Sequence, residues 1–463
     1  MDSTLDRRDD SLSPTKRRAP LRWALVVLWS RRDGDRIGEL AWVDPGRTRV
    51  LGRPARDATD RLRLVRQRPG GDEPGGPIAS KYVSRDQLRV RVLGTDALHV
   101  HNVGRVGLRV NGHDVGQGQV RVGDVLELDR ELLLLATRRP AWLPPLDTPD
   151  HPFGAANSDG IVGEGPSVWT LRRRLEFLAD QPGHVLITGA SGTGKELVAR
   201  ALHARSGRRR GPWVPSNAAA VPEGIAEAEW FGNRPDYPNA GMPARKGLAG
   251  EADGGTWFLD ELGELPHALQ AHLLRLLDGG EVQRLGEARP RRVDVRVVAA
   301  TNRDPSALKH DVLARFPHRI HLPGLDARRE DVPLLVRSLL RGMAERRPAL
   351  GRFLRQGVPR LTPRLWLALH RHRFTGHVRE LQQLLWASAA EAEGDWLDTG
   401  PEVAVSPEPA AQPLPATSPD ELGPEQIEAA LVAADGVKER AWRALGLRNR
   451  HQLRRLMQKH GLT

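Results

Sequence analysis

The chain has no cysteine among its 463 residues. Without thiols it can form neither disulfides nor thiolate-ligated metal sites, so we expect a reducing compartment. Long apolar runs are also missing, because the most apolar early stretch, Trp23 to Trp29, is too short to span a bilayer. No signal-peptide cleavage pattern accompanies that stretch. These absences favour a cytoplasmic protein.

The bulk composition is ordinary for a soluble multidomain chain. Charged residues make up 28% and hydrophobic residues 39%, and the length allows two to four domains. The 36 prolines and 47 glycines indicate several linkers. The net charge of +12 favours a polyanionic partner, although an Arg-rich composition can also come from a GC-rich genome.

A glycine-rich segment between a predicted strand and a predicted helix organises the chain. It follows the apolar run 185–188 and precedes 197–203, whose apolar spacing fits one helix face. Such a loop with Lys at its seventh position is typical of a phosphate-binding P-loop, in which backbone amides and the helix N-terminus surround phosphate oxygens. The alternative is a simple glycine turn. The predicted nucleotide-binding residues are Gly189, Ala190, Ser191, Gly192, Thr193, Gly194, Lys195 and Glu196.

A second apolar strand, 256–259, ends in two carboxylates, Asp260 and Glu261. This pattern fits a Walker B element, in which Asp260 holds Mg²⁺ and Glu261 orients and deprotonates the attacking water. Strands that end in acidic residues are common, so this pattern is a strong signal only in combination with the P-loop. Together the two segments predict ATP and Mg²⁺ as cofactors and an ATPase activity.

The N-terminal third is built differently. Residues 1–20 are polar and are predicted to form a disordered tail. Residues 21–140 hold short alternating segments separated by turns such as Asp44-Pro45-Gly46 and Asn111-Gly112, which predicts a β-sandwich. The expected strands cover 25–28, 38–43, 89–92, 98–101, 108–110 and 125–128.

This sandwich resembles forkhead-associated (FHA) domains in Leu51-Gly52-Arg53, in residues 83–87 and in Val110-Asn111-Gly112. The resemblance implies that Arg53, Ser84 and Arg85 bind a phosphothreonine protein through charge-assisted hydrogen bonds. Gln87 and Val106 stand where that family has His and Asn. The alternative is a sandwich that only docks on a neighbouring domain.

The rest of the chain reads as four further segments. Residues 141–158 are predicted to be a stiff linker, and 159–336 alternate strands and helices, including a helix over 166–179, a helix over 268–277 and a strand over 293–299. Such alternation predicts a parallel sheet with the nucleotide at the carboxyl ends of its strands. Helical sequence continues over 337–398, and 399–420, with six prolines, is a predicted flexible linker.

The α/β segment resembles the AAA+ domain of sigma-54-dependent transcriptional activators. The matching stretches are the P-loop with Glu196 after Lys195, then 251–262, 270–277 and 295–302. The resemblance implies a homo-oligomeric ring, a hexamer in that family, with a helical lid. It further implies that Asn217 restrains Glu261, that Asn302 senses the γ-phosphate, and that Arg379 is a second sensor on the lid.

Two departures from that family concern partners. The segment Asp236 to Gly241 replaces the Gly-Ala-Phe-Thr-Gly-Ala loop that contacts the sigma factor, and Pro235 and Pro238 stiffen it. The two arginine fingers that serve a neighbouring subunit align with Lys309 and Arg315, and Lys lacks the planar fork. Two functions therefore stay open: ATP-driven remodelling of RNA polymerase carrying sigma-54, or ATP-binding regulation independent of sigma-54.

Residues 421–463 look like a Fis-type helix-turn-helix with helices over 424–435, 437–445 and 449–460. After Asp435 eight Lys and Arg residues face a single acidic residue, Glu439, which predicts salt-dependent DNA binding. The alternative is a small basic packing domain. The predicted DNA-binding residues are Arg448, Arg450, His451, Arg454 and Arg455.

Overall fold

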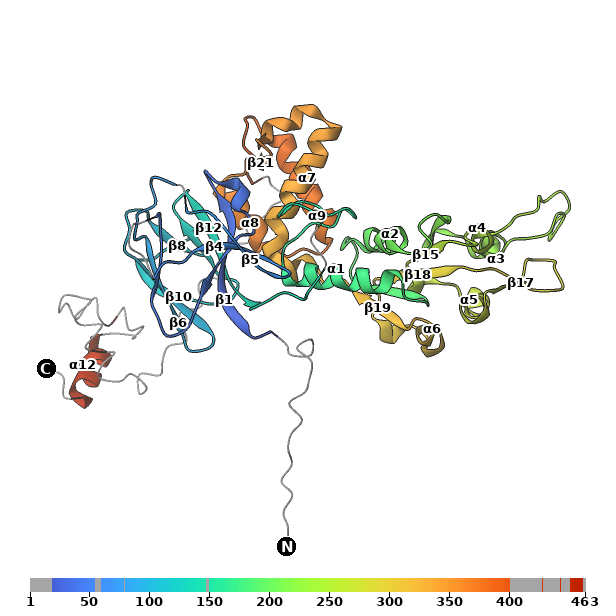
Figure 1. The fold of residues 1–463 in the computed structure, drawn as a ribbon, viewed down its shortest axis with the longest axis horizontal. Coiled ribbons are helices and arrows are strands. Elements are labelled where there is room, and N and C mark those ends of the chain that lie inside the picture. Colours follow the sequence, from blue (N-terminus) through green and yellow to red (C-terminus); the bar gives the residue numbers. More distant parts are fainter. Residues whose placement is uncertain are drawn as a thin grey trace, which may run out of the picture. The chain divides into compact units, whose positions relative to one another are not determined.

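The computed structural model describes residues 19–54, 60–78, 80–146, 150–399 and 450–460, together with Ile427 and Trp442. The chain divides into two compact units, Met1–Val403 and Ala404–Thr463. The first unit contains a β-sandwich, a parallel α/β sheet and a helical lid (Figure 1). No helix in the described ranges is long and apolar enough to cross a membrane.

The predicted β-rich architecture of the N-terminal region is confirmed. One antiparallel sheet has the order β5-β4-β2-β1-β12-β11-β8-β9 and the other β10-β7-β6-β3, with the core of apolar side chains between them. The Asn111-Gly112 turn has φ of 52° and 86°, as a tight hairpin requires. The strands are β1 (Leu21–Ser30), β2 (Leu40–Val43), β3 (Arg49–Leu51), β4 (Leu64–Arg68), β5 (Gly71–Pro74), β6 (Leu88–Leu93), β7 (Ala97–Asn102), β8 (Leu108–Val110), β9 (His113–Asp114), β10 (Gln117–Val120), β11 (Val125–Leu128) and β12 (Leu132–Pro140).

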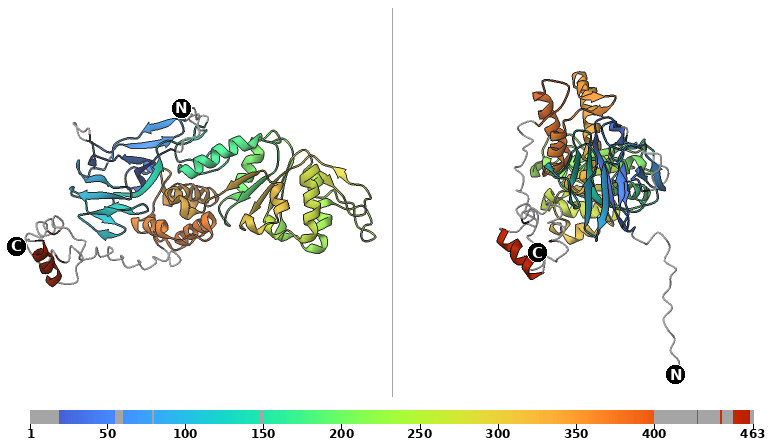
Figure 2. Two further views of the ribbon diagram at one scale, coloured as in Figure 1. Left: turned by 90° about the horizontal axis from the view of Figure 1, so that it is seen from below. Right: turned by 90° about the vertical axis from the view of Figure 1, so that its left-hand side faces the viewer.

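The predicted parallel sheet is also confirmed, with the strand order β14-β15-β18-β13-β19. Apolar clusters cover both of its faces, and Figure 2 shows helices on either side. Its strands are β13 (Val185–Thr188), β14 (Trp213–Asn217), β15 (Thr256–Asp260), β18 (Arg296–Thr301) and β19 (His318–His321). Its helices are α1 (Pro166–Ala179), α2 (Lys195–Arg205), α3 (Glu223–Phe231), α4 (Leu248–Glu251), α5 (His267–Gly279) and α6 (His310–Ala314).

One predicted strand of this sheet begins later than expected. The sequence predicts 293–299, whereas β18 begins at Arg296, which pairs with Thr256 of β15. Val293 instead donates its backbone N–H to Gly280, and the Asp294 carbonyl accepts from Gly254. These two loop hydrogen bonds hold the preceding residues out of the parallel ladder.

The lid follows the sheet and is helical, as predicted, with one interruption. The segment η6 (Leu325–Asp331) leads into α7 (Val332–Arg346), and α8 (Pro363–Arg371) and α9 (His377–Glu391) complete it. Between α7 and α8 lie η7 (Pro348–Phe353) and a short hairpin, β20 (Leu354–Arg355) and β21 (Val358–Pro359). The hairpin turns at Gln356 and Gly357, both with positive φ.

The segment 141–158, predicted to be a stiff linker, is packed in its described part. Leu143, His151 and Asn157 are buried, and the His151 ring stacks on Trp169 of α1 at 5.6 Å. The apolar and aromatic side chains among its prolines give it a surface to bury. Its described part is therefore integrated into the first unit.

In the second unit, α12 (Arg450–Lys459) confirms the last predicted helix to within one residue at each end. Apart from Ile427 and Trp442, the predicted helices over 424–435 and 437–445 lie outside the described residues, as do the tail 1–18 and the linker from 400 onward.

Candidate nucleotide-binding site

The P-loop lies between β13 and α2, with its glycines in conformations that other residues rarely adopt. Gly192 and Gly194 have φ of 78° and 101°. A Cβ on Gly192 would overlap the carbonyl oxygen of Gly376, so the lid approaches the loop backbone directly. The chain turns inward here because glycine allows it, and α2 begins at Lys195 with its first N–H groups at the loop.

Lys195 is buried, and its Nζ donates to the carbonyls of Gly189 and Ala190 at 3.1 and 3.3 Å. The ammonium group is therefore held over the loop. Thr193 Oγ1 also donates to the Ala190 carbonyl, at 2.8 Å. Glu196 pairs with Arg200 one helical turn later, at 3.0 Å. A positive charge fixed beside free helix N–H groups favours an anionic ligand.

The acidic edge of the site is set by strand pairing. Asn217 of β14 and Asp260 of β15 occupy paired positions of the parallel ladder. Asn217 Oδ1 accepts from the Ala219 N–H at 2.8 Å, and Asp260 Oδ1 accepts from the Glu261 N–H at 3.0 Å. Glu261 itself has φ of 55°, which is unusual for a residue with a long side chain and is typical of functional sites.

These segments line one cavity of about 590 Å³, a volume within the range of small-molecule sites. Its polar wall holds the P-loop from Ser191 to Glu196, together with Asn217, Asp260 and Glu261. Arg379 of α9 reaches it from the lid and lies 3.4 Å from Ser191 Oγ. The apolar wall includes Ile161, Val162, Val168, Leu171, Leu335 and Leu339. The polar groups thus suit phosphates and the apolar side chains a planar base.

Five predicted residues of the nucleotide site lie outside the lining of this cavity, and two of them, Gly189 and Ala190, are the P-loop residues whose carbonyls accept from Lys195. Asn302 is exposed directly after β18. Lys309 and Arg315 flank the short helix α6, and Arg315 forms an ion pair with Asp278 of α5.

Arg328 lines the cavity, although sequence reasoning did not single it out. Its guanidinium is buried and donates to the Thr193 carbonyl at 3.3 Å, and burial lowers the pKa of Arg328. In the sequence it belongs to the charge run 328–331, a pattern more typical of a solvated surface. Its burial depends on tertiary packing that no local pattern reveals.

Comparison with known proteins identifies the family. Residues 161–320 match the family model described as "Sigma-54 interaction domain". The transcriptional regulatory protein ZraR of Klebsiella oxytoca is 36% identical over 337 residues, which cover 70% of this chain and 72% of ZraR. The chain belongs to the family of sigma-54-dependent transcriptional regulators. This confirms the family indicated by the P-loop and Walker B sequences.

Two further similarities concern parts of this regulator. The anaerobic nitric oxide reductase transcription regulator NorR of Escherichia coli (strain SMS-3-5 / SECEC) is 42% identical over 246 residues, covering 50% of this chain and 46% of NorR. The crystal structure of NtrX from Brucella abortus in complex with ATP covers 65% of this chain and 69% of NtrX, with 28% identity and a TM-score of 0.47.

The sandwich of this regulator brings two of its predicted phosphate-binding loops together. The Arg53 N–H donates to the Ser84 carbonyl at 3.1 Å, and Ser84 Oγ accepts from the Arg105 N–H at 3.0 Å. Arg85 is exposed beside them. Arg61, which sequence reasoning missed, donates to the carbonyls of Arg53 and Arg85 and so ties the loops.

Gln87 supports these loops through hydrogen bonds of its side chain. It is fully buried, and its Nε2 donates to Asn102 Oδ1 and to the Val106 carbonyl, both at 2.8 Å. Its Oε1 accepts from the Ser84 N–H at 3.0 Å. These three hydrogen bonds tie the serine loop to Asn102 and to the Val106 backbone.

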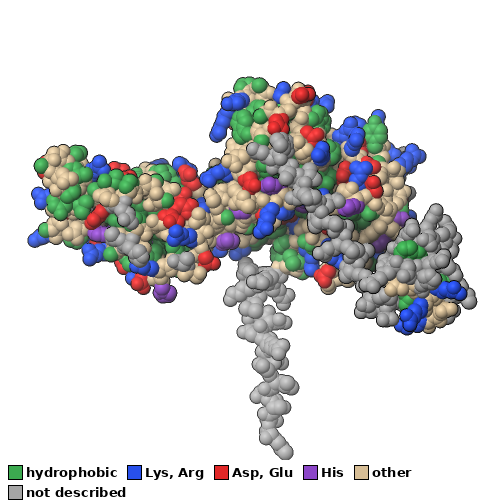
Figure 3. Space-filling model, turned by 180° about the vertical axis from the view of Figure 1, so that it is seen from behind, with side chains coloured by type: hydrophobic (Ala, Val, Ile, Leu, Met, Phe, Trp, Pro, Cys, Tyr) green, Lys and Arg blue, Asp and Glu red, His purple; other side chains and the backbone are tan. Residues whose placement is uncertain are grey.

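The helix α12 of this regulator is amphipathic. Leu453, Leu456 and Met457 are buried, whereas Arg454 and Arg455 are exposed. Arg448 and the side chains of Arg450 and His451 lie outside the described residues. Figure 3 shows Lys and Arg side chains spread over the visible face, with Asp and Glu between them.

Proposed function

We propose that this regulator binds ATP in the cavity and hydrolyses it. The observation that carries this proposal is the convergence on one cavity of Lys195, the Asp260–Glu261 pair and Arg379, which come from three separate stretches of the chain. The P-loop amides and Lys195 would hold the phosphates, and the apolar wall would receive the base.

The residues at the acidic edge would carry out the hydrolysis. Glu261 would orient the attacking water and accept its proton, and Asn217, paired in the ladder with Asp260, would restrain Glu261 until the nucleotide state changes. Asp260 offers the hard oxygen that Mg²⁺ prefers, and the metal would neutralise phosphate charge. The described residues contain no group of three or more His, Asp or Glu side chains that could hold a metal alone, so phosphate oxygens would complete its shell.

Hydrolysis would take place between subunits of a ring, a hexamer by family resemblance. Arg315 and Lys309 flank α6 outside the subunit's own cavity lining, so they would serve the cavity of a neighbour. Asn302, exposed at the end of β18, would sense the γ-phosphate. We therefore expect turnover per subunit to rise with protein concentration, and concentration-independent turnover by a monomer would contradict the ring.

The proposed output is remodelling of RNA polymerase carrying sigma-54 at promoters bound by the C-terminal segment. Exposed Arg454 and Arg455 on α12 support DNA contacts, with Arg448, Arg450 and His451 as the further predicted contacts. The proposed input is a phosphothreonine protein at Arg53, Ser84 and Arg85. We expect weak phosphopeptide binding that Arg53→Ala abolishes, and equal binding of unphosphorylated peptide would contradict it.

One observation favours a second function, regulation without sigma-54. The segment that replaces the sigma-contact loop is tied at its base by Asn233, which is fully buried and donates to the carbonyls of Arg234, Tyr237 and Pro243 at 2.8 to 3.1 Å. The Tyr237 ring packs on Gly286 of a second loop. These contacts hold the loop against its own domain, whereas a sigma-contact loop must extend from the domain to reach its partner.

Open-complex formation by sigma-54 polymerase on a promoter with a mapped binding site separates the two functions. The first predicts ATP-dependent open complexes that Glu261→Ala eliminates while ATP still binds. The second predicts specific footprints and ATP binding without open complexes. Lys195→Ala should abolish ATP binding in calorimetry, and an unchanged affinity would overturn the site itself.

A further inference from the structure

The sandwich has a second apolar face, and this face packs on the lid. Along β1, alternate side chains enter the sandwich core, and those between them join a separate cluster with lid residues. A register shift between Val27 and Trp29 places Trp29 in the same cluster as Leu28. Such an irregularity re-aims a side chain without ending the strand. The sandwich residues of this cluster are Ala24, Val26, Leu28, Trp29, Ile37, Leu40, Val125, Leu133 and Leu135.

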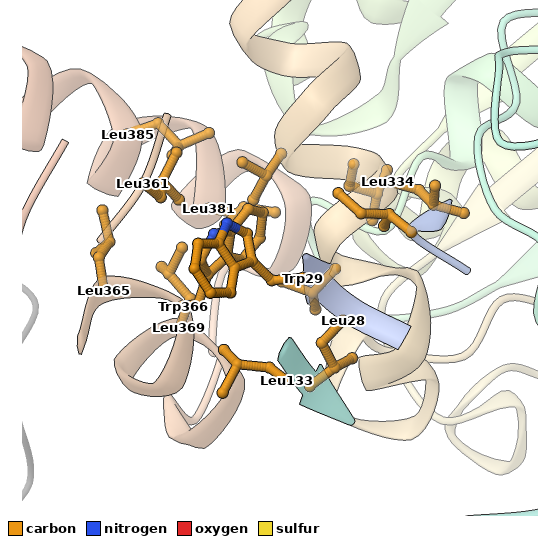
Figure 4. Packing of buried hydrophobic residues seen from close by; sticks show 14 of the residues in the cluster. Leu28, Trp29, Leu133, Leu334, Leu361, Leu365, Trp366, Leu369, Leu381 and Leu385 are labelled. Atoms are coloured by element: carbon orange, nitrogen blue, oxygen red, sulfur yellow. The ribbon is translucent and has the colours of Figure 1, made fainter. Parts of the chain in front are cut away.

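Lid side chains cover this face closely. Figure 4 shows the Trp29 ring among leucines of the lid and beside Trp366 of α8. Arg371, also of α8, donates to the carbonyl of Asn111 in a sandwich turn. The contact therefore combines an apolar centre with a polar rim, as stable interfaces do.

Beside the apolar contact lies a buried ionic junction. Arg139 of β12 donates to the Glu164 carbonyl at 2.6 Å, and its Nε lies 3.7 Å from Glu330 Oε2 in η6. Burial raises the pKa of Glu330 above its ordinary value, and the nearby Arg139 opposes this shift. A buried carboxylate of this kind depends on its cation, because removing one partner leaves an uncompensated charge.

The same η6 segment is attached to the nucleotide cavity. Asp331 Oδ1 accepts from the N–H groups of Glu164 and Gly165, both at 2.8 Å. Three residues earlier, Arg328 donates to the Thr193 carbonyl of the P-loop. Since η6 also leads directly into α7, it joins the sandwich, the segment before α1, the P-loop and the lid.

We propose that Arg139 of the sandwich is a positioning residue for the nucleotide site. Through Glu330 it fixes η6, which in turn holds Arg328 against the P-loop and sets the lid over the cavity. This inference rests on the proposed ATP binding. Because coupling is reciprocal, a ligand that changes how the sandwich docks changes ATP affinity, and ATP changes the docking.

Calorimetric titration of the full chain with ATP tests the coupling. Arg139→Met and Glu330→Gln should each weaken ATP binding by about 2- to 30-fold, the range typical of coupling through packed networks. The double variant should bind about as weakly as either single variant, because the two side chains act as a unit. Arg139→Lys, which keeps the charge, should restore part of the affinity.

The matched control is Arg91→Met, which removes an exposed arginine from β6 of the same sandwich and should leave affinity unchanged. Wild-type affinity in Arg139→Met would overturn the inference. A wild-type protein that binds no ATP would overturn the proposed function instead.

Hydrogen exchange supplies a readout that needs no variant. ATP should slow amide exchange in β1 and in β12, because it stabilises the docked state, and it should do so less in Glu330→Gln. Unchanged exchange in these two strands of the wild-type chain at saturating ATP would overturn the inference even if Arg139→Met does not fold.

Discussion

Two strands of one sandwich, β1 and β6, show opposite patterns of burial. In β6, Leu88 and Val90 are buried and Arg89 and Arg91 are exposed, which is the alternation expected when one face of an antiparallel sheet meets water. In β1, every residue from Trp23 to Ser30 is buried. The difference arises because the lid covers the outer face of the first sheet. An unbroken apolar run in an antiparallel strand can therefore mark a docking face.

The strongest test of the difference between β1 and β6 is to remove the largest side chain at the covered face. Trp29→Ala should lower the free energy of unfolding of the first unit by about 3–5 kcal/mol, because a buried Trp leaves a cavity between strand and lid. Urea unfolding followed by circular dichroism measures the change. Arg91→Ala on β6 is the control, and an equally small effect of both variants would mean that the lid does not cover β1.

Acid should weaken the covered face through His370 of α8. Burial, together with the charges of Arg329 and Arg371, lowers the pKa of His370 to about 4, and a backbone hydrogen bond to Gly123 of the sandwich opposes this shift. Between about pH 6.5 and pH 4 the unfolded chain binds this proton and the folded chain does not. The free energy of unfolding should therefore fall by about 3 kcal/mol as the pH decreases across this window.

His370→Leu removes this titration and serves as the matched variant. The difference between the two profiles of stability against pH isolates His370, since every other group titrates in both proteins. Parallel profiles between pH 4 and pH 6.5 would show that His370 is accessible to protons in the folded state.

A matched pair of valines sharpens the comparison further. Val26→Ala on β1 and Val90→Ala on β6 remove the same atoms from buried positions, one against the lid and one inside the sandwich. Each should lower the free energy of unfolding by about 2 kcal/mol, from two lost methyl groups and the space they leave. A loss confined to Val90→Ala in thermal unfolding would show that the covered face is open in solution.

The smallest effect is expected on the exposed face of β6. Burial lowers the pKa of His99, and the neighbouring Arg91 and His101 lower it further. Arg91→Thr should raise the pKa of His99 while changing stability by no more than about 0.5 kcal/mol, as surface substitutions do. An NMR titration of the His99 ring follows the first quantity, and an unchanged pKa would mean that Arg91 does not act on this ring.

The parts of the site that sequence predicts are those with local causes. The glycines of the P-loop, the helix 166–179 and the strand ending in Asp260 each depend on neighbours in the chain, and the structure has them where expected. The apolar run Trp23–Trp29 is equally evident in the sequence. On its own, however, it excludes only a membrane span and does not reveal what covers it.

The parts that sequence reasoning misses depend on contacts between distant segments. Arg328 reads as a surface charge until η6 is folded against Thr193. The prolines around His151 are visible in the sequence and indicate a linker. The stacking partner of His151, Trp169, lies in a helix farther along the chain, so the local sequence does not reveal the contact. Likewise β18 starts at Arg296 because Val293 donates to the Gly280 carbonyl and Asp294 accepts from the Gly254 N–H, so neither residue joins the parallel ladder.

The pairing of Asn217 with Asp260 makes the nucleotide site sensitive to the register of two strands. The two side chains share a face only because β14 and β15 are in one hydrogen-bonding register. A slip of a single residue would turn one of them to the opposite face of the sheet. One residue inserted between Trp213 and Ser216 would therefore disable the cavity while leaving every motif of the nucleotide site intact in the sequence.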